Sequence, residues 1–571
     1  MYDLVIRNGK IVDGSGEASF MGDIAINGDR IVKIGLIEDK GNKEIDAEGN
    51  LVTPGWVDIH THYDGQVCWD EYLTPSCWHG VTTVVMGNCG VGFAPVKPGT
   101  EEFLVQLMEG VEDIPGVALN EGVSWDWESF PEYLDSIGKK NYAMDIGAMI
   151  GHGPIRSYVM GMDRCQGKEE ASDDEINEMA KITKEAIEAG ALGFSTSRTY
   201  LHRDKFGEYV PGTEATAKEM RKIANTIADL GQGTLEIVSD WMDQDIELDW
   251  VKEFVEKSDR TLTYAQTGGN PVETWKYCEE NFSKGVKIRP QFPGRPTGML
   301  FSLESTVHPF IAHPSYAEIV DKSLEEKVAT MKDESFRQKI LSEEPAVDKN
   351  HMIYTLMMSF DKQFPMNEIP DYEPSYEESI AGIAESSGKS VMEVMYDEML
   401  KNEGKTFVWA PFSPYPDHNL DTYKMMMEFE SSVAGLSDGG AHCGLICDAS
   451  MPTWNVAHYT RDRVKGEKIP LEFLIRKQTK ETAETFGLMD RGQIKEGYLA
   501  DINIIDHENL CVYKPEMVHD LPTGSRRIIQ KAGGYIATIK SGVVTFKNDQ
   551  ATGELPGTVL RGERTAEAIS A

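Results

Sequence analysis

A regular alternation of short apolar strands and amphipathic helices is the feature that most constrains the fold of this chain. Strands followed by helices at intervals of about 30–45 residues form βαβ units, in which successive strands are parallel. Such a series predicts an α/β body, and a (β/α)₈ barrel of about 250 residues can absorb much of a chain of this length. The expected strands are residues 57–60, 82–86, 144–150, 191–195, 235–238, 261–265, 286–288 and 433–436.

Two of the expected helices begin with capping signals. Ser172 and Glu175 have the spacing of a capping box, and Thr216 and Glu219 have the same spacing. The first pair opens a helix over 172–190, and its apolar side chains recur on one helical face. Each helix precedes an expected strand, as a βαβ unit requires.

Both ends of the chain predict antiparallel strands instead. Asn8-Gly9 and Asn27-Gly28 are type I′ hairpin signals between short strands, and the C-terminal part ends in strands again. Strands on both sides of one α/β body imply that the two ends build one small β domain. The expected units are a β domain from residues 1–53 and 483–571, a barrel over 54–482, and a helical insertion over 296–405.

Residues 296–405 interrupt the alternation and are too long for a connecting loop. They are rich in helix formers, acidic residues and methionine, and flexible thioethers suit an adaptable apolar pocket. We expect a part of this insertion to cover the barrel mouth and exclude water. The alternative is a helical appendage packed on the outside. The methionines are Met299, Met331, Met352, Met357, Met358, Met366, Met392 and Met395.

The composition excludes several classes of function. The 56 basic and 94 acidic residues give a net charge of −38, which disfavours the clustered cations that nucleic-acid binding needs. No signal peptide and no apolar stretch of about 18 residues is visible. The eight cysteines lack the spacing of a disulfide framework. We expect a cytoplasmic protein that acts on a small molecule without nucleic-acid or membrane partners, and a homo-oligomer stays open.

Four expected strand ends carry side chains suited to metal or acid–base chemistry. His60 and His62 follow the first barrel strand and point the same way, so they can share one cation. Cys89 follows the second strand among glycines, and Asp438 follows the last. A carboxylate there can bind a metal and take a proton from water. His152 follows the third strand and could polarise a carbonyl group.

Each of these side chains also has an ordinary structural explanation. The two histidines at 60 and 62 could lie on a surface loop, and a single buried cysteine is more often a small hydrophobic residue. Asp438-Gly439 is a common turn at a strand end, and His152 could be a loop histidine with satisfied hydrogen bonds. Spacing alone does not decide between these readings.

Four motifs in this order resemble the metal-dependent amidohydrolase superfamily, and the resemblance runs from residue 2 to about 510. They are DLVIRNGKIVDGSG at 3–16, NLVTPGWVDIHTHYD at 50–64, LSDGGAH at 436–442 and GQIKEGYLADINIID at 492–506. The segments NCG, GHGPIR and GALGFSTSRTY are most similar to the N-acyl-D-amino-acid deacylases. This resemblance implies a (β/α)₈ TIM barrel joined to a β-sandwich built from both termini. It also implies zinc, hydroxide attack on an amide, and an aspartate as acid and base.

The resemblance implies only some of the family's metal ligands in this chain. It implies that His60, His62, Cys89 and Asp438 bind metal. The deacylases also use histidines on strands five and six, where this chain has Glu236 and Gln266 near the corresponding places. The lysine that many relatives carbamylate is missing from 190–200 as well. We therefore expect about one Zn²⁺ per chain, because the remaining set gives one metal four protein ligands.

Several further residues are candidates for substrate binding. Arg198, Arg295 and Arg156 each follow an expected strand, so each could clamp a substrate carboxylate at the barrel mouth. The alternative for each is a salt bridge to one of the many acidic residues. Tyr200 could hydrogen-bond an acyl or carboxylate oxygen. Glu236 and Gln266 are expected near the substrate, because the resemblance puts them about where the family has histidines.

The sequence therefore predicts a metal-dependent hydrolase of a linear amide, such as an N-acyl (D-)amino acid. In this reading Asp438 is the general acid and base, and His152 helps to hold the oxyanion. Hydrolysis of a cyclic amide, or deamination, is an alternative that a single metal also supports. A barrel that lost catalysis and serves as a scaffold is the alternative of another class. The missing strand-five and strand-six histidines favour it, and His60, His62 and Asp438 oppose it.

Overall fold

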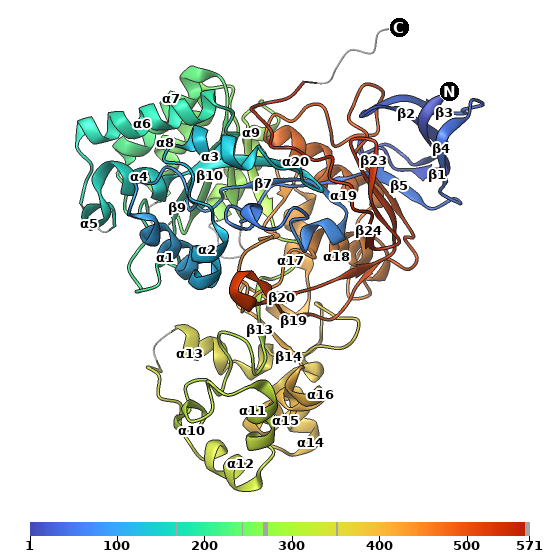
Figure 1. Ribbon diagram of the computed structural model, residues 1–571. Coiled ribbons are helices and arrows are strands. Elements are labelled where there is room, and N and C mark those ends of the chain that lie inside the picture. The colour runs from blue at the N-terminus through green and yellow to red at the C-terminus, as the bar shows by residue number, and fades with distance from the viewer. Residues whose placement is uncertain (167–168, 242–243, 267–271, 350–351, 566–571) are drawn as a thin grey trace.

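A barrel of eight parallel strands forms the centre of the molecule (Figure 1). The computed structural model describes residues 1–565 except 167–168, 242–243, 267–271 and 350–351. The strands lie in the order in which they occur along the chain, which is what consecutive βαβ units produce. They are β6 (Trp56–Asp58), β7 (Val81–Met86), β8 (Asp145–Gly151), β9 (Gly193–Arg198), β10 (Thr234–Ser239), β11 (Leu262–Ala265), β12 (Ile288–Phe292) and β16 (Val433–Ala434).

The first and last strands close the barrel just beyond their ends. Thr61 forms a parallel bridge with Gly439, and the Asp438 backbone N–H donates to the His60 carbonyl oxygen at 3.1 Å. The His62 N–H donates to the Gly439 carbonyl oxygen at 2.8 Å. Each expected barrel strand coincides with or lies within a few residues of an observed one, and the predicted α/β barrel is confirmed.

Helices cover the outside of the barrel. Ser172 caps α6 (Asp173–Glu188) with the predicted capping box. Thr216 also caps α7 (Ala217–Leu230), but the Glu219 carboxylate does not return to the Thr216 N–H, so that box is incomplete. The remaining helices around the barrel are α1 (Glu101–Glu112), α2 (Gly116–Gly122), α3 (Phe130–Ile137), α4 (His152–Met160), α5 (Met162–Cys165), α8 (Gln244–Lys257), α9 (Val272–Phe282), α17 (Asp421–Glu428), α18 (Met451–Ala457), α19 (Leu471–Gln478) and α20 (Lys480–Thr485).

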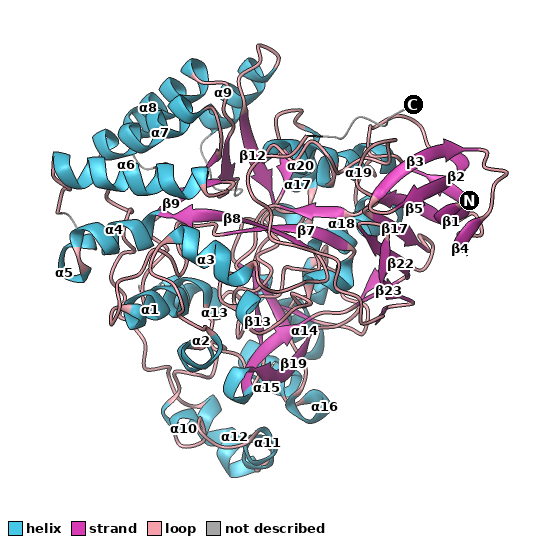
Figure 2. Ribbon diagram, turned by 45° about the horizontal axis from the view of Figure 1, so that its top comes forward, coloured by secondary structure: helices cyan, strands magenta, loops and turns pink. Residues whose placement is uncertain are grey.

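Both ends of the chain contribute strands to one nine-stranded sheet beside the barrel (Figure 2). Its central contact is between β5 and β17, which pair antiparallel. The bounds predicted for the domains stay predictions. The strands are β1 (Tyr2–Ile11), β2 (Phe20–Asn27), β3 (Arg30–Gly35), β4 (Gly41–Asp46), β5 (Leu51–Pro54), β17 (Ile502–Ile505), β22 (Tyr535–Lys540), β23 (Val543–Lys547) and β24 (Gln550–Ala551).

The first of the two hairpin signals is misleading. Asn27-Gly28 joins β2 and β3 as expected, but Asn8-Gly9 lies inside the continuous strand β1. The register with β2 shifts there, and Asn8 has a φ of 55°, so the pair forms a bulge. A Cβ on Gly9 would lie 2.5 Å from Cγ2 of Val52, which explains the glycine without a turn.

The insertion leaves the barrel after β12 and projects from it at the bottom of Figure 1. Met299, Met331 and Met395 are buried in its own apolar core, so these methionines do not form the expected adaptable pocket. The insertion contains β13 (Gly298–Phe301), α10 (Pro314–Ala317), α11 (Leu324–Met331), α12 (Glu334–Leu341), α13 (Met352–Met357), β14 (Phe364–Pro365), α14 (Ile380–Ser387), α15 (Val391–Met399) and α16 (Lys401–Gly404). The strand β15 (Val408–Pro411) pairs with both β13 and β14 and leads back to the barrel.

The chain beyond the last barrel strand also forms the two-stranded pairs β18 (Cys511–Val512) with β21 (Ala532–Gly533), and β19 (Glu516–Leu521) with β20 (Ser525–Ile529). None of the helices in the described part of the chain combines the length and apolar character needed to cross a bilayer.

A buried ion cluster ties the barrel to the terminal sheet. Asp145 at the start of β8 contacts Arg491 at 2.7 Å and Lys540, at the end of β22, at 2.9 Å. Burial alone raises the pKa of Asp145, but the charges of Lys540 and Arg491 outweigh it and lower the pKa to about 2. Lys540 also contacts Asp501 at 2.9 Å. Breaking one member would leave buried charge without its counterion.

We therefore expect Asp145→Asn to lower the free energy of unfolding by about 3–5 kcal/mol, measured by urea denaturation. An unfolded aspartate has a pKa of about 3.9, so the contribution of Asp145 is present above that pH and is lost as the pH falls toward 2. Asp135→Asn is the control, because Asp135 pairs with Arg561 on the surface and its side chain is 73% exposed. This control should cost at most about 1 kcal/mol. Equal effects of the two substitutions would contradict the role of the cluster.

Candidate metal centre

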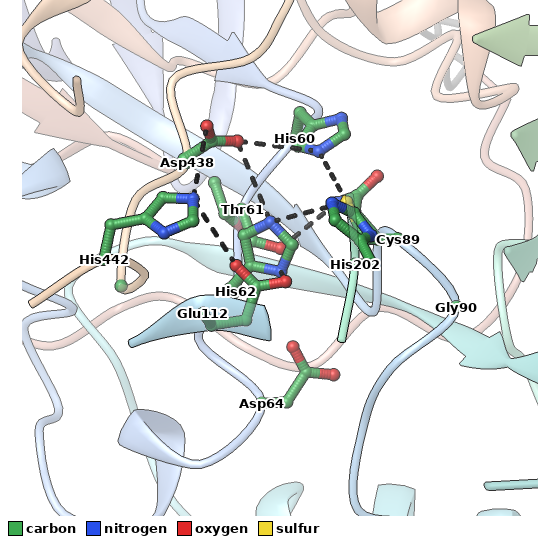
Figure 3. A network of polar contacts seen from close by, with 12 residues as sticks. His60, Thr61, His62, Asp64, Cys89, Gly90, Glu112, His202, Asp438 and His442 are labelled. Atoms are coloured by element: carbon green, nitrogen blue, oxygen red, sulfur yellow. Dashed lines mark hydrogen bonds and ion pairs between the residues drawn. The ribbon is translucent and has the colours of Figure 1, made fainter. Parts of the chain in front are cut away.

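Four predicted ligands meet at the carboxyl ends of the barrel strands (Figure 3). His60 and His62 follow β6, Cys89 follows β7, and Asp438 follows β16. Because side chains alternate along an extended segment, His60 and His62 point into the same space. The barrel closure described above then brings Asp438 opposite them.

The donor atoms of these residues form a closed ring. Cys89 Sγ lies 3.4 Å from His60 Nε2 and 4.0 Å from His62 Nε2. Asp438 Oδ1 lies 3.6 Å from His60 Nε2 and 3.8 Å from His62 Nε2. A tetrahedral zinc site with bonds of about 2.0–2.3 Å has edges of about 3.3–3.8 Å. His60, His62 and Cys89 have ligand atoms that all lie within 4.8 Å of one another, so these three side chains fit one metal ion. Asp438 lies against both histidines but outside this group, so it would have to approach Cys89 to complete a tetrahedron.

The backbone at this site adopts a conformation that side chains rarely take. Cys89 has a φ of 57°, Asp438 of 50° and His442 of 53°. Such left-handed residues persist where surrounding structure holds them, and they concentrate at functional sites. Gly90 follows Cys89 with a φ of 69°, and a Cβ there would lie 2.7 Å from the Ser197 backbone nitrogen. The NCG motif thus turns sharply against β9 and presents the sulfur to the histidines.

Polar side chains behind the two histidines orient their rings. His60 Nδ1 lies 2.9 Å from Gln291 Oε1, so it can donate to this amide while Nε2 faces the other ligands. Gln291 is held in turn by its Nε2, which donates to Thr263 Oγ1 at 3.1 Å. His62 Nδ1 lies 3.3 Å from Glu112 Oε1, which is an ion-pair distance without the geometry of a hydrogen bond. A carboxylate or amide behind a ligating histidine fixes its tautomer and raises its basicity.

Three residues at the site were missed by the sequence analysis. Glu112 is the last residue of α1, and nothing in its local sequence distinguishes it from the many exposed acids. His442 belongs to the LSDGGAH motif, and its Nε2 lies 3.8 Å from Glu112 Oε2 and 4.0 Å from Asp438 Oδ2. His202 lies in the loop after β9, where its Nδ1 contacts Ser197 Oγ at 2.9 Å. His442 could have been found from its motif.

Several groups at the site hold protons that a metal ion could replace. Burial raises the pKa of the Cys89 thiol well above its usual value, and the nearby acids Glu112 and Glu236 raise it further. Burial also raises the pKa of Glu236 to about 8, and one of its carboxylate oxygens has no hydrogen-bond partner. Burial alone would lower the pKa of His62, but Glu112 and Asp438 outweigh it and raise the pKa to about 9. A metal ion would replace the protons of Cys89 and His62.

The pKa values of the other two ligands suit metal binding without such an exchange. Burial lowers the pKa of His60 to about 4, so its imidazole is neutral. Burial alone would raise the pKa of Asp438, but His62 and His60 hold it well below its usual value. Asp438 is therefore ionised at neutral pH and can bind a metal or accept a proton.

A cavity of about 260 Å³ opens from the ligands toward the barrel mouth. Thr297, just before β13, and Phe412, just after β15, are among the residues that line it. The base of the insertion therefore contributes to the mouth. The other residues around the cavity are His60, His62, Cys89, Val111, Glu112, Thr199, Leu201, His202, Val238, Ser239, Asp240, Ala265, Leu436, Asp438, His442 and Ile446.

Strand alternation places two predicted substrate-binding residues away from this cavity. Ser197 faces the cavity, since its hydroxyl contacts the cavity residue His202, whereas Arg198 is one residue later and points to the opposite side. Its Nε donates to Glu247 Oε1 at 2.7 Å, which is the salt-bridge alternative. Likewise Ala265 lines the cavity, and Gln266 instead accepts a hydrogen bond from the Tyr264 hydroxyl at 2.9 Å. The strand-six position that faces the site is therefore Ala265.

His152 and Arg156 also lie outside the cavity. The two ring nitrogens of His152 lie 2.8 Å from Thr196 Oγ1 and 2.8 Å from Glu219 Oε1. Arg156 contacts the same Glu219 carboxylate at 2.6 Å. Because the Glu219 carboxylate binds His152 and Arg156, it does not return to the Thr216 N–H, which explains the incomplete capping box of α7. Since His152 belongs to this network, the expectation that it holds an oxyanion is wrong.

The remaining candidates for substrate binding are Arg295, Tyr200 and Glu236. Arg295 is fully buried, contacts Asp448 at 3.1 Å and stacks over Tyr372 at 3.8 Å, so it does not reach the cavity. The Tyr200 side chain is exposed, and its backbone N–H donates to Asp240 Oδ2 at 2.7 Å. Glu236 lies against the site, because its Oε2 accepts the Cys89 backbone N–H at 3.2 Å.

Comparison with known proteins finds the same fold and related sequences. The model of the amidohydrolase family matches residues 43–546. The D-aminoacylase of Alcaligenes xylosoxydans xylosoxydans is 26% identical over 566 residues, which cover 98% of this chain and 97% of that protein. A solved D-aminoacylase, studied for one-metal activation and second-metal attenuation of its binuclear centre, has a TM-score of 0.64 at 22% identity, covering 99% of this chain and all of the other. The N-acyl-D-glutamate deacylase of Bordetella bronchiseptica, solved with zinc and a phosphonate inhibitor, has a TM-score of 0.63 at 20% identity, covering 98% and 99%.

We expect the protein to bind about one zinc ion per chain after zinc loading and dialysis, because His60, His62 and Cys89 are the one compact group of metal donors among the described residues. Cys89→Ser should lose most of this metal, since a hydroxyl is a poor zinc ligand, and elemental analysis measures the loss. Cys77→Ser is the matched control, because Cys77 is also buried but has no place in the ring of donors. Two ions per chain at full occupancy, or metal retained by Cys89→Ser, would contradict this site.

Proposed function

Because a family model matches most of its length, the chain belongs to the amidohydrolase family, and we propose that it hydrolyses a linear amide with the aid of one metal ion. It is a hydrolase of carbon–nitrogen bonds other than peptide bonds. The observation that carries the proposal is the ring of four donors from His60, His62, Cys89 and Asp438 beside a cavity. An inactive scaffold would have no need to keep these buried groups together.

Zinc is the metal that we propose for this ring. Two imidazole nitrogens, one sulfur and one carboxylate oxygen are donors that suit zinc. When bound, a divalent cation supplies Lewis acidity, which polarises an amide carbonyl and makes water acidic enough to attack at neutral pH. The zinc in the Bordetella deacylase structure supports this choice.

Asp438 is the residue that we propose to move protons. Its Oδ1 faces His60 and His62, and its Oδ2 lies 4.0 Å from His442 Nε2 at the cavity wall. Because Asp438 is ionised at neutral pH, it can accept a proton from the attacking water. The same carboxyl group can then donate this proton to the leaving amine.

His202 and His442 take the place that was expected for His152. Both line the cavity, so either ring can reach a carbonyl oxygen of the substrate. Burial lowers the pKa of His202 to about 3, which keeps its imidazole neutral. When the Ser197 hydroxyl donates to His202 Nδ1, the proton of the ring lies on Nε2 and is available to an oxyanion.

The relatives suggest the kind of amide. The D-aminoacylase match over almost the whole chain and the fold shared with an N-acyl-D-glutamate deacylase support an N-acyl amino acid type of substrate, with a D configuration as the first choice. Hydrolysis of N-acyl D- and L-amino acids and their derivatives by the zinc-loaded protein tests this proposal directly. Release of the free amine from any of them would support it.

Asp438→Asn is the sharpest test of the mechanism. The amide keeps an oxygen near the histidines but lacks a basic group, so turnover should fall by about 10²–10⁴-fold while the fold is kept. The measurements are kcat by amine release, metal content by elemental analysis, and circular dichroism. Asp506→Asn is the control, because Asp506 is also an aspartate in a turn after a strand but belongs to the terminal sheet. Near-normal turnover of Asp438→Asn with metal bound would refute the proposed role.

A further inference from the structure

The cavity beside the metal ligands has an apolar wall and an acidic floor. Val238, Ala265 and Ile446 are among its apolar side chains, and Leu201 and Phe412 stand exposed at its mouth. The carboxylates of Asp240, Glu112 and Asp438 also line it. Asp438 and Glu112 pair with the histidines of the site, so Asp240 is the acid that a substrate group meets beside the hydrocarbon wall.

No lysine or arginine lines the cavity among the residues that the structure describes. Arg198 is held by Glu247 at 2.7 Å and by the carbonyl oxygens of Gly212 and Ala215. Arg295 is buried against Asp448.

The histidines of the cavity do not replace such a cation. His442 Nε2 lies between Glu112 and Asp438, at 3.8 and 4.0 Å, so two acidic side chains of the protein already pair with it. His202 is kept neutral by its burial, which lowers its pKa to about 3. Both rings can donate a hydrogen bond, but neither supplies a free positive charge for a substrate carboxylate.

Asp240 fixes the acidic character of the floor. Its Oδ1 accepts the Thr199 hydroxyl at 2.6 Å, and its Oδ2 accepts the Tyr200 N–H at 2.7 Å. These donors are uncharged, so they leave the negative charge of the carboxylate in the cavity. A substrate carboxylate beside it would be repelled, whereas an amide N–H could use its remaining lone pairs.

We propose that this cavity selects an N-acyl amino acid derivative whose carboxyl group is uncharged, such as a carboxamide or an ester, and that Asp240 is the residue that disfavours free carboxylates. This inference rests on the proposed amide hydrolysis and specifies its substrate class. The apolar wall receives the hydrocarbon of the side chain or acyl group. The amide or ester end lies toward Asp240.

A matched pair of substrates tests the inference. N-acetylphenylalanine and N-acetylphenylalaninamide differ only at the carboxyl end, which is a carboxylate in the first and an uncharged amide in the second. Both D and L forms are compared with the zinc-loaded protein. We expect kcat/KM for acetyl release from the carboxamide to be at least about tenfold higher than from the carboxylate, as expected for one unscreened charge contact. Equal rates, or a preference for the carboxylate, would overturn the inference and leave the proposed amide hydrolysis intact.

Binding separates this inference from the proposed function. The affinities of the same pair for the slow variant Asp438→Asn are measured by isothermal titration calorimetry. At least about tenfold tighter binding of the carboxamide supports the inference even if the parent protein hydrolyses neither compound, which would refute only the proposed function. No measurable difference in affinity would overturn the inference.

Two substitutions test whether charge causes the preference for the carboxamide. Asp240→Asn keeps an oxygen acceptor for the Tyr200 N–H but removes the charge. It should lower the ratio of kcat/KM for the carboxamide to kcat/KM for the carboxylate. Leu201→Arg places a cation at the mouth, where Leu201 is 60% exposed and a longer side chain fits. It should raise kcat/KM for the carboxylate at least about tenfold above that of Leu201→Gln, the uncharged control. An unchanged preference in both variants would contradict the role of charge.

Discussion

The pairing of the first barrel strand with the last is the interaction on which the site depends. The bridge between Thr61 and Gly439 and the hydrogen bond from the Asp438 N–H to the His60 carbonyl set Asp438 opposite the two histidines. These residues are almost 380 positions apart in the chain, so only barrel closure brings them together. Cys89 completes the ring from the neighbouring strand. A carboxylate that binds metal and moves protons is thus positioned by backbone hydrogen bonds of the fold.

Because several buried acids surround these ligands, the site favours the binding of a cation. Glu112, Glu236 and Asp438 lie near the Cys89 thiol and disfavour its ionisation while no metal neutralises them. His62 compensates for part of this charge through its raised pKa. A divalent ion that displaces these protons would satisfy the same carboxylates, which connects metal affinity to pH. The proposed exclusion of substrate carboxylates rests instead on Asp240, which is not one of these acids.

The sequence predicted much of the fold and the metal ligands, because both leave local signals. Apolar strands at regular intervals predicted the barrel, and strand ends with unusual polar residues predicted His60, His62, Cys89 and Asp438. The direction in which a strand side chain points was harder to predict, because an error of one residue in position moves it to the other face of the strand. Arg198 and Gln266 were misassigned for this reason. Glu112 comes from the end of a helix and reaches the site only through tertiary packing, so no local pattern marks it.

The donor set of the metal is the central claim, and zinc X-ray absorption spectroscopy of the zinc-loaded protein measures it directly. The structure predicts one sulfur at about 2.3 Å, and two imidazole nitrogens and carboxylate oxygen at about 2.0–2.2 Å, around each ion. Cys89→Ser should remove the sulfur shell from any zinc that remains bound. A spectrum without sulfur in the parent protein, or one with two or more sulfurs per zinc, would contradict the centre built from His60, His62, Cys89 and Asp438.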